Sequence, residues 1–432
     1  MYKPRVLLSD YRQPDISAEI PFLFHRAGCI VDVYCAKNSW LRKNVYHHTW
    51  YEAPVGDQNA YVSGLIACAE KQTYDWIVLT EDEAVRLVND AVWNKVQCTS
   101  DEARLLATSK AEFSKICFAH GILTPSYTIV SVDEYIKQDK DKSIEKIIGK
   151  GMEEIKLPIV VKVDRSSGGE GVFLCHSHED VFRVLCDIQR KKIEKNINSE
   201  QNIVLQAYIK GDNVSCEALF QKGTLLACAC SRITSTTGGE FNVSAGRIYK
   251  HDPDVEDILH TIGHTFNFDG FYNITFIQDT SSKELYFIEA DMRPNIWFSL
   301  TRHAGIDFSE AIKTYIDSNT HGNSSECSSL LPTSVLRASG QGVPVWHFHR
   351  TISNLLMNGT IKDIFLGMLP WVMNSKGRWH YIPIYDRKLF CAVCMYLCRL
   401  GMRRVGDTYP QLRSIKRILI QKFSMILNRY PH

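Results

Sequence analysis

Short apolar runs alternate with longer amphipathic stretches over the first hundred residues. The runs at 5–10, 29–34 and 75–80 predict strands, and the stretches 18–27 and 61–71 between them predict helices. Alternating strands and helices are typical of a parallel α/β sheet. The turn after the first run reads Ser-Asp-Tyr rather than GxGxxG, and no GxxxxGKS/T sequence occurs in the chain. The pattern therefore indicates neither a dinucleotide fingerprint nor a P-loop.

The pattern changes after residue 100, where strands follow one another without long helices between them. A helix is expected over 102–121, a turn over 210–213, and a mobile loop rich in Ser, Thr and Gly over 234–246. Apolar runs predict strands, several of them antiparallel, at 157–161, 203–209, 214–220, 224–230, 270–278 and 284–290. Charge-rich stretches at 137–156 and 190–201 favour solvated helices.

The order of these elements predicts the domain organisation. An α/β domain is expected over residues 1–100 and an α+β domain over 101–317. Residues 318–329, rich in Ser and Asn, are expected to form a linker, and 330–432 a basic, mainly helical region.

Composition narrows the function classes. The chain has 432 residues, of which 45% are hydrophobic and 23% charged, as in ordinary soluble globular proteins. A net charge of only +2 argues against nucleic acid as a partner. The first residues lead directly into a strand, and no apolar stretch approaches the roughly 20 residues of a membrane span, so neither a signal peptide nor a transmembrane helix is predicted. Fourteen cysteines without a paired framework favour reduced thiols and a cytoplasmic location.

The C-terminal region carries most of the positive charge. Residues 387–432 hold ten Lys or Arg and one acid, a net charge of +9, which leaves −7 for the preceding 386 residues. The apolar stretch 389–400 is too short to cross a bilayer, but with the basic residues it is consistent with peripheral contact to an anionic membrane. Docking of an acidic partner, a homodimer interface, and a helical domain packed on the rest of the chain are the alternatives, and we favour the last.

A lysine followed by a glycine loop is the first candidate for chemistry. Lys162 interrupts an apolar run, and a lysine in a buried strand is costly unless it meets an anion. A loop of small residues follows, in which backbone N–H groups can approach a phosphate: Ser166, Ser167, Gly168, Gly169 and Gly171. The segment predicts a nucleotide-phosphate site. A hairpin turn with the lysine extending along the strand edge is the alternative.

The sequence Glu289-x-Asp291-x-Arg293 is the second candidate. Alternation along a strand places these three residues on one face. Magnesium prefers oxygen ligands and is commonly shared between carboxylates and substrate phosphates. The alternative is a surface ladder of charges, but the apolar run before Glu289 and the proline after Arg293 disfavour it.

Taken in order, these pieces resemble a known family. Lys110 before 121–125, Lys162 before its glycine loop, the segment 206–209 before Gly211, then Glu217, and finally 289–294 resemble the ATP-grasp superfamily of carboxylate–amine and carboxylate–thiol ligases over about residues 5–315. Within this superfamily, the chain resembles both the carbamoyl-phosphate-synthase-like and the D-alanine-ligase-like enzymes. The resemblance implies a pre-ATP-grasp α/β domain, a two-lobed ATP-grasp domain, and ATP with Mg²⁺, or Mn²⁺ as an alternative metal. It also implies an enzyme that forms an acyl phosphate and joins a small-molecule carboxylate to an amine, or less often a thiol.

The resemblance implies a role for each matching residue. Lys110 and Lys162 would contact the α- and β-phosphates, and the glycine loop would cover them. The adenine would contact Gln206, Ala207, Tyr208 and Ile209, and the ribose Glu217. The metal ligands would be Glu289, Asp291, Thr275 and Asn273, and the catalytic residues Arg293, Lys162 and Arg247. Independently of the resemblance, candidate contacts for a substrate carboxylate are Arg232, Arg247, Arg302 and His303, because an arginine fork suits a carboxylate; ordinary surface arginines are the alternative. For Lys110, Gln206 and Glu217, ordinary surface or strand-edge positions remain the alternatives.

One departure from the family pattern bears on activity. The position of Thr275 usually holds an acidic metal ligand, and Asp291 stands where the family usually has asparagine. Neutral oxygens bind magnesium but cancel none of its charge. Weaker metal binding is expected, and a catalytically impaired ATP-binding regulatory or scaffold protein is the alternative function.

Overall fold

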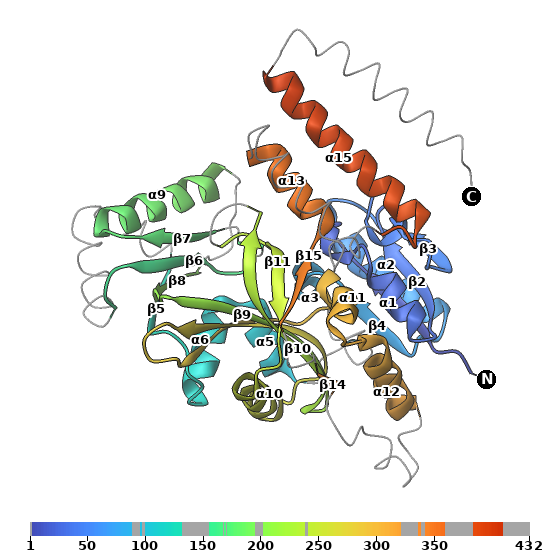
Figure 1. The fold of residues 1–432 in the computed structure, drawn as a ribbon, viewed down its shortest axis with the longest axis horizontal. Helices are drawn as coiled ribbons and strands as arrows, with labels where there is room; N and C mark the ends of the chain where they lie inside the picture. The colour runs from blue at the N-terminus through green and yellow to red at the C-terminus, as the bar shows by residue number, and fades with distance from the viewer. Residues whose placement is uncertain are drawn as a thin grey trace.

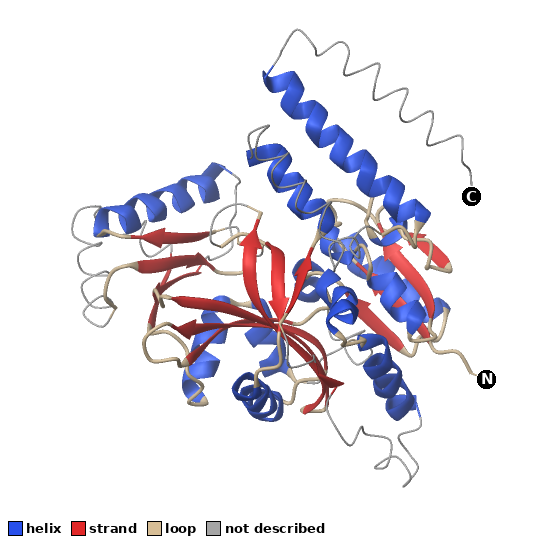
Figure 2. Cartoon of the chain, in the orientation of Figure 1, coloured by secondary structure: helices blue, strands red, loops and turns tan. Residues whose placement is uncertain are grey.

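The computed structural model describes residues 2–88, 96, 100–131, 155–166, 168–169, 171–194, 202–237, 241–320, 336–337, 342–358 and 383–408. In this part of the chain three sheets are surrounded by helices (Figures 1 and 2). The α/β character expected from the sequence is confirmed.

The N-terminal sheet is parallel and has the strand order β3-β2-β1-β4. Its strands are β1 (Arg5–Ser9), β2 (Ile30–Cys35), β3 (Thr49–Glu52) and β4 (Trp76–Leu79). Among the described residues its helices are α1 (Ile20–Arg26), α2 (Gln58–Lys71) and α3 (Asp82–Leu87), with short 3-10 turns η1 (Asp15–Ser17) and η2 (Leu41–Lys43). Apolar side chains point to both faces of each strand, because α1 covers one face and α2 the other.

A small antiparallel sheet forms a separate lobe with the order β5-β8-β6-β7. Its strands are β5 (Tyr127–Ser131), β6 (Ile159–Val163), β7 (Val172–Cys175) and β8 (Asn202–Ala207). The amphipathic helix α9 (His178–Glu194) packs on this sheet and buries Val181, Leu185 and Ile188. The lobe therefore has its own small core.

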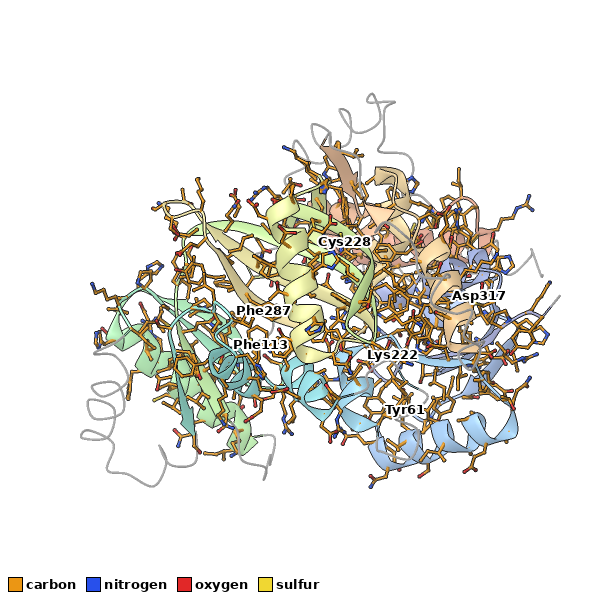
Figure 3. The ribbon with its side chains drawn as sticks, turned by 90° about the horizontal axis from the view of Figure 1, so that it is seen from below. Tyr61, Phe113, Lys222, Cys228, Phe287 and Asp317 are labelled. Atoms are coloured by element: carbon orange, nitrogen blue, oxygen red, sulfur yellow. The ribbon has the colours of Figure 1, made fainter. Side chains whose placement is uncertain are left out.

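The large sheet has the order β13-β12-β9-β10-β11-β15, with β14 beside β10. Its strands are β9 (Gly211–Gln221), β10 (Thr224–Thr236), β11 (Ser244–Tyr249), β12 (Gly270–Asp279), β13 (Leu285–Asp291), β14 (Leu336–Arg337) and β15 (Val343–Trp346). One face packs against α5 (Asp101–Thr108), α6 (Lys110–Ala119) and α10 (Pro253–Phe266). Figure 3 shows Phe113 of α6 beside Phe287 of β13, with ring centroids 4.7 Å apart.

Further helices cover the other face of the large sheet. They are α11 (Ile296–Leu300), the 3-10 turn η3 (Thr301–Ala304) and α12 (Phe308–Thr320). Beyond them, α13 (Phe348–Asn358) and α15 (Arg387–Thr408) lie along each other (Figure 1). Leu389 and Val393 of α15 enter the core shared with α1 and α11. Among the described residues, no helix has the length and apolar character needed to cross a membrane.

The prediction of one continuous helix over 102–121 is wrong, because the chain forms two helices separated at Ser109. The Ser109 hydroxyl accepts a hydrogen bond from the Glu112 backbone N–H at 3.1 Å and caps α6. Lys110 is therefore the first residue of a helix rather than part of a continuous one.

Other expected boundaries also need correction. The predicted turn 210–213 is wrong, because β9 begins at Gly211. The predicted loop 234–246 is shorter, since β10 continues to Thr236 and β11 begins at Ser244. The first three residues of the predicted linker, 318–320, end α12, and the rest of the linker lies outside the described residues.

Strands near the C-terminus were not expected from the sequence. The region beyond residue 330 was expected to be mainly helical, but β15 pairs with β11 and extends the large sheet. The expected helix over 137–156 lies almost entirely outside the described residues, as does the second half of the one expected over 190–201.

Candidate functional site

Four oxygen-bearing side chains lie together on one face of the large sheet. The register of β12 and β13 places Asn273 opposite Asp291 and Thr275 opposite Glu289. Directly opposed residues of an antiparallel pair have Cβ atoms about 4.5–5.5 Å apart. Ile274, between the two β12 positions, points into the core on the other face. The structure therefore brings together the four residues that the sequence proposed as metal ligands.

A bulge in β13 turns the two carboxylates toward this face. Phe287 pairs with Phe276 and lies in the core, whereas Glu289 pairs with Thr275, so one residue of β13, Ile288, has no counterpart on β12. An extra residue of this kind shifts the alternation of the side chains by one position. Without it, Glu289 would follow Phe287 into the core.

Arg293 is held in place by carboxylates from α3 and β13. Its Nε and Nη2 atoms donate to the two oxygens of Asp82 at 2.5 and 3.1 Å, and Nη2 also donates to Asp291 at 2.9 Å. A planar guanidinium suits such a two-point contact. The described bonds use Nε and Nη2 and leave Nη1 for another acceptor.

The pKa values of these acids reflect their crowding. The pKa of Asp291 is raised to about 8, chiefly by burial and also by the charges of Asp82 and Glu289, against the lowering effect of Arg293. For Asp82, burial also favours a higher pKa, but the charge and hydrogen bonds of Arg293 hold it below its ordinary value. A further cation near Asp291 would favour its ionised form.

Lys162 is the least satisfied charge in the site. It is 8% exposed, and among the described residues no group accepts a hydrogen bond from its ammonium. Its pKa is lowered to about 8, chiefly by burial and also by the charge of Lys110, while Glu289 opposes the shift. Lys162 therefore lies near both Glu289 and Lys110, in a position where an anion would stabilise its charge.

Lys110 is fixed between α6 and the small lobe. Its ammonium donates to the backbone carbonyl of Ser166, and to the Ser166 hydroxyl at 3.3 Å. Asp164 accepts hydrogen bonds from the Lys110 backbone N–H at 2.7 Å and from the Ser109 hydroxyl at 3.0 Å. The start of α6, the lysine and the base of the glycine loop are thus held together.

The glycine loop lies against the connection between β10 and β11. Gly168, Gly169 and Gly171 have φ values of +65°, +80° and +74°, which side chains rarely allow. A Cβ atom on Gly169 would lie only 2.0 Å from the backbone oxygen of Phe241. Ser167, also part of the predicted loop, lies outside the described residues.

The segment expected to contact adenine joins the small lobe to the large sheet. Gln206 ends the buried part of β8, and Ala207, Tyr208 and Ile209 follow half-buried before β9. The Ala207 backbone N–H donates to Ser126 at 2.8 Å. The structure places this segment between the lobes, as a hinge would be.

Glu217 and Arg247 form a buried ion pair. Arg247 Nη1 donates to Glu217 at 2.5 Å, and the Tyr249 hydroxyl donates to its other oxygen at 2.9 Å. Arg247 also stacks over Trp297, 4.3 Å from the ring centroid. Because both oxygens of Glu217 are already bonded within the protein, this arrangement does not support a contact between Glu217 and a ribose.

The predicted substrate arginines bond elsewhere. Arg232 donates to Asp212 at 3.1 Å and to Gln278 at 2.6 Å near the end of the large sheet. Arg302 donates to Ser299 and lies 3.5 Å from Glu19. The structure does not bring either guanidinium into contact with Arg293 or Lys162.

Two residues of the site were missed in the sequence. Asp82 lies 211 positions before Arg293, to which it is hydrogen-bonded. In the sequence it is an ordinary acidic residue in the first turn of a helix, and nothing there points to a site. Asp164 stands two residues after Lys162, and its position at the end of a strand was the available signal. Lys110, Lys162 and Arg293 together surround the carboxylates, an arrangement that suits a polyanion bound with a divalent cation.

Comparison with known proteins places the fold. No family model matches the chain. The D-alanine–D-alanine ligase of Desulforamulus reducens is 25% identical over 136 residues, which are 32% of this chain and 39% of that protein. The ligase of the same name from Carboxydothermus hydrogenoformans is 27% identical over 117 residues, 27% of this chain and 33% of that protein. The matches thus span well under half of these relatives.

Solved structures resemble the chain over more of its length. N5-carboxyaminoimidazole synthetase from Staphylococcus aureus, complexed with ADP, has a TM-score of 0.57 at 14% identity and covers 87% of this chain and 90% of its own. L-amino acid ligase from Bacillus licheniformis has a TM-score of 0.54 at 13% identity over 75% of this chain and 77% of its own. The biotin carboxylase domain of Hydrogenobacter thermophilus 2-oxoglutarate carboxylase was solved with MgADP and bicarbonate. Its TM-score is 0.55 at 15% identity, over 73% of this chain and 69% of its own. At identities of 13–15%, the structural similarity establishes the fold alone.

Proposed function

Since this chain has the ATP-grasp fold, we propose that it is an ATP-dependent ligase that joins a small-molecule carboxylate to an amine. In the proposed reaction a carboxylate oxygen attacks the γ-phosphorus of ATP, and ADP leaves. The amine nitrogen then attacks the acyl carbon, loses a proton, and phosphate leaves. A thiol acceptor would react in the same way.

The buried ammonium of Lys162 carries this proposal. Its charge is withdrawn from water, forms no hydrogen bond or close ion pair among the described residues, and lies near Lys110 and the opposite charge of Glu289. An unpaired buried charge is expensive. A phosphate group between the two lysines would satisfy it.

The residues of β12 and β13 fit a magnesium ion. Glu289, Asp291, Asn273 and Thr275 supply only oxygen donors, on adjacent strands and on one face. Bound there, Mg²⁺ would neutralise charge on the phosphates of ATP. With two neutral donors among the four, we expect the ion to depend strongly on the nucleotide for its own binding.

We propose that Arg293 stabilises the phosphoryl group in transfer. Asp82 and Asp291 fix its orientation and leave Nη1 available. A guanidinium that is already oriented costs no reorganisation when charge develops during transfer. Arg247 donates a hydrogen bond to Glu217 within the protein. This contact does not bring Arg247 to the phosphoryl group, so its catalytic role stays a prediction.

The second candidate is an ATP-binding protein without turnover. Thr275, a neutral oxygen directly opposite Glu289, is the observation that favours it. The two candidates differ in whether ADP is released.

A coupled ADP-release assay with pooled carboxylates and amines tests the ligase. We expect release that requires both pools and disappears in Lys162→Ala and in Glu289→Ala. The matched controls are Lys191→Ala and Glu284→Ala, exposed residues on α9 and before β13. Release that survives both site variants would refute the assignment, and nucleotide binding without release for every pool would favour the second candidate.

A further inference from the structure

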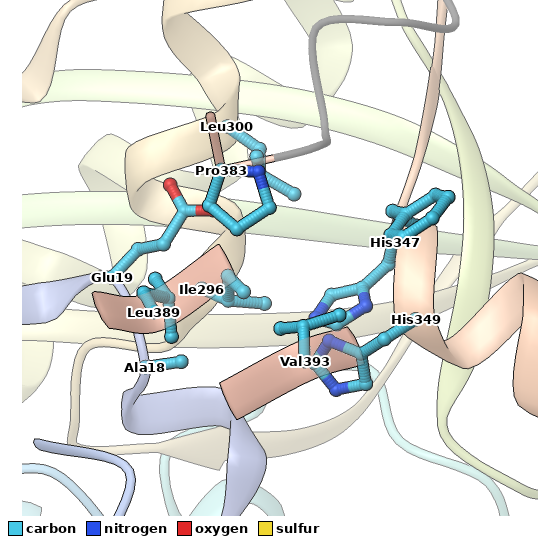
Figure 4. Close-up of a pocket in the computed structure, with 10 residues that line it drawn as sticks. Ala18, Glu19, Ile296, Leu300, His347, His349, Pro383, Leu389 and Val393 are labelled. Carbon is cyan, nitrogen blue, oxygen red and sulfur yellow. The ribbon is translucent and has the colours of Figure 1, made fainter. Parts of the chain in front are cut away.

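A second polar cluster lies where the N-terminal domain meets the C-terminal segment. Asp15 belongs to η1, His347 follows β15, and His349 lies in the first turn of α13. One ligand-type atom of each residue lies within 4.8 Å of those of the other two. The histidines are 2% and 5% exposed. Figure 4 shows them beside a small cavity whose lining also includes Glu19, Ile296, Leu389 and Val393.

One nitrogen in this cluster lacks a partner. The Nε2 atom of His347 is buried and forms no hydrogen bond among the described residues. A buried polar atom left unsatisfied costs about 1–3 kcal/mol. The adjacent cavity of about 10 Å³ has room for one water-sized ligand.

We propose that Asp15, His347 and His349 bind one divalent transition-metal ion, of which zinc fits the donors best. Two imidazole nitrogens and one carboxylate oxygen, with water in the fourth position, form a familiar zinc environment. The cavity beside the histidines provides the space for that water.

Two existing contacts change when the ion binds. His347 Nδ1 accepts a long hydrogen bond from the Arg350 backbone N–H at 3.4 Å, so the neutral ring has its proton on Nε2 and gives up this bond when the proton moves to Nδ1. His349 Nε2 donates to Asp15 Oδ2 at 2.8 Å, and the metal would replace that proton. Zinc bonds of about 2.0–2.2 Å separate tetrahedral ligands by roughly 3.3 Å, so the side chains need to move by about an ångström.

Arg350 has two opposing effects on the site. Its Nη2 and Nε atoms donate to the two oxygens of Asp15 at 2.8 and 3.0 Å. These bonds orient the carboxylate, as outer hydrogen bonds do for metal ligands. The positive charge of Arg350 weakens cation binding, so we expect a moderate affinity.

Metal binding would connect distant parts of the chain. Asp15 and His349 are 334 positions apart, and the ion would fasten α13 to the N-terminal domain. A ligand that binds only the folded state stabilises it. Zinc should therefore raise the unfolding temperature of the full chain.

Zinc titration of the chelator-treated full chain tests the proposal. We expect one equivalent of Zn²⁺ by elemental analysis, a higher unfolding temperature, and at least tenfold weaker binding in His347→Gln. His178→Gln is the matched control, because His176 and His178 form another His-x-His sequence at exposed positions. No stoichiometric zinc, or equal binding by wild type and His347→Gln, would overturn the site.

A second measurement applies if His347→Gln does not fold. Co²⁺ replaces zinc in such sites, and its visible absorption reports the coordination number. We expect the intense bands of a four-coordinate ion in the wild-type protein, unchanged in His178→Gln. The weak spectrum of hexaaqua Co²⁺ would contradict the proposal.

Discussion

Glu217 illustrates how the role of one side chain depends on partners far along the chain. Its position in a strand was predictable, but Arg247 and Tyr249 reach it from β11, across β10. The same holds for Asp82 and Arg293. Lys162, in contrast, was identified because its signal is local, a charge within an apolar strand.

Asp10 is a buried carboxyl group outside the proposed nucleotide site. Its Oδ2 atom accepts a hydrogen bond from Ser39 at 2.6 Å, and Oδ1 has no partner in the part of the chain that the structure describes. Burial raises its pKa from 3.8 to about 7, with the Ser39 bond opposing and Glu81 contributing. Folding therefore favours the protonated form of Asp10.

This shift predicts a pH dependence of stability. Between pH 3.8 and about 7 the folded state holds a proton that the unfolded chain loses, so the contribution of Asp10 falls as pH rises. The Asn side chain does not titrate. Relative to wild type, Asp10→Asn should therefore gain about 4 kcal/mol of unfolding free energy between pH 4 and pH 8, at 1.36 kcal/mol per pH unit.

Urea denaturation at the two pH values measures this gain. Asp187→Asn, an exposed substitution on α9, serves as the control and should show little change. A difference between Asp10→Asn and wild type that is the same at both pH values would contradict the assignment.

Within elements, the sequence predicted the strands of the site but not their irregularities. The apolar run before Glu289 indicated β13, yet nothing in it marks Ile288 as the extra residue that turns the carboxylates toward the site. The break at Ser109 was equally hidden, because its cause includes Asp164 on another lobe. Tertiary contacts, rather than local propensity, decide both features.

The glycine loop gives a prediction for one element. Gly169→Ala combines a strained φ of +80° with a Cβ atom 2.0 Å from Phe241 O, so the loop cannot keep its position against the β10–β11 connection. We expect at least tenfold weaker ATP binding, since about 1–2 kcal/mol is lost to the left-handed backbone alone. Unfolding temperature should change little, because the loop lies outside the cores.

Gly168→Ala separates the two causes. Its φ of +65° carries a similar backbone cost, but its Cβ atom would meet only a Val243 methyl at 3.9 Å. Calorimetric titration with ATP should show a smaller loss for this variant. Equal losses would mean that the contact with Phe241 is unimportant.

Across the whole molecule, the proposed site depends on elements from all three sheets. Lys162 comes from the small lobe, Glu289 and Asp291 from the large sheet, and Asp82 from α3, which follows β4 of the N-terminal sheet. Two hydrophobic cores continue from the N-terminal sheet to the large sheet and hold these parts together. Repeated strand–helix patterns and ordered motifs were enough to predict this fold class. The pairing of β15 with β11 was not predictable, because the two strands are about a hundred residues apart in the sequence.

The central claim is that the buried ammonium of Lys162 binds a phosphate of ATP. Calorimetric titration of wild type, Lys162→Met and the exposed control Lys191→Met with ATP and Mg²⁺ tests it most directly. Loss of a charge-assisted hydrogen bond of about 1.5–3 kcal/mol predicts roughly 10–100-fold weaker binding for Lys162→Met. Its unfolding free energy should be undiminished, because methionine removes a buried charge whose burial outweighs the attraction of Glu289. ATP binding of equal strength in wild type and Lys162→Met would contradict the account.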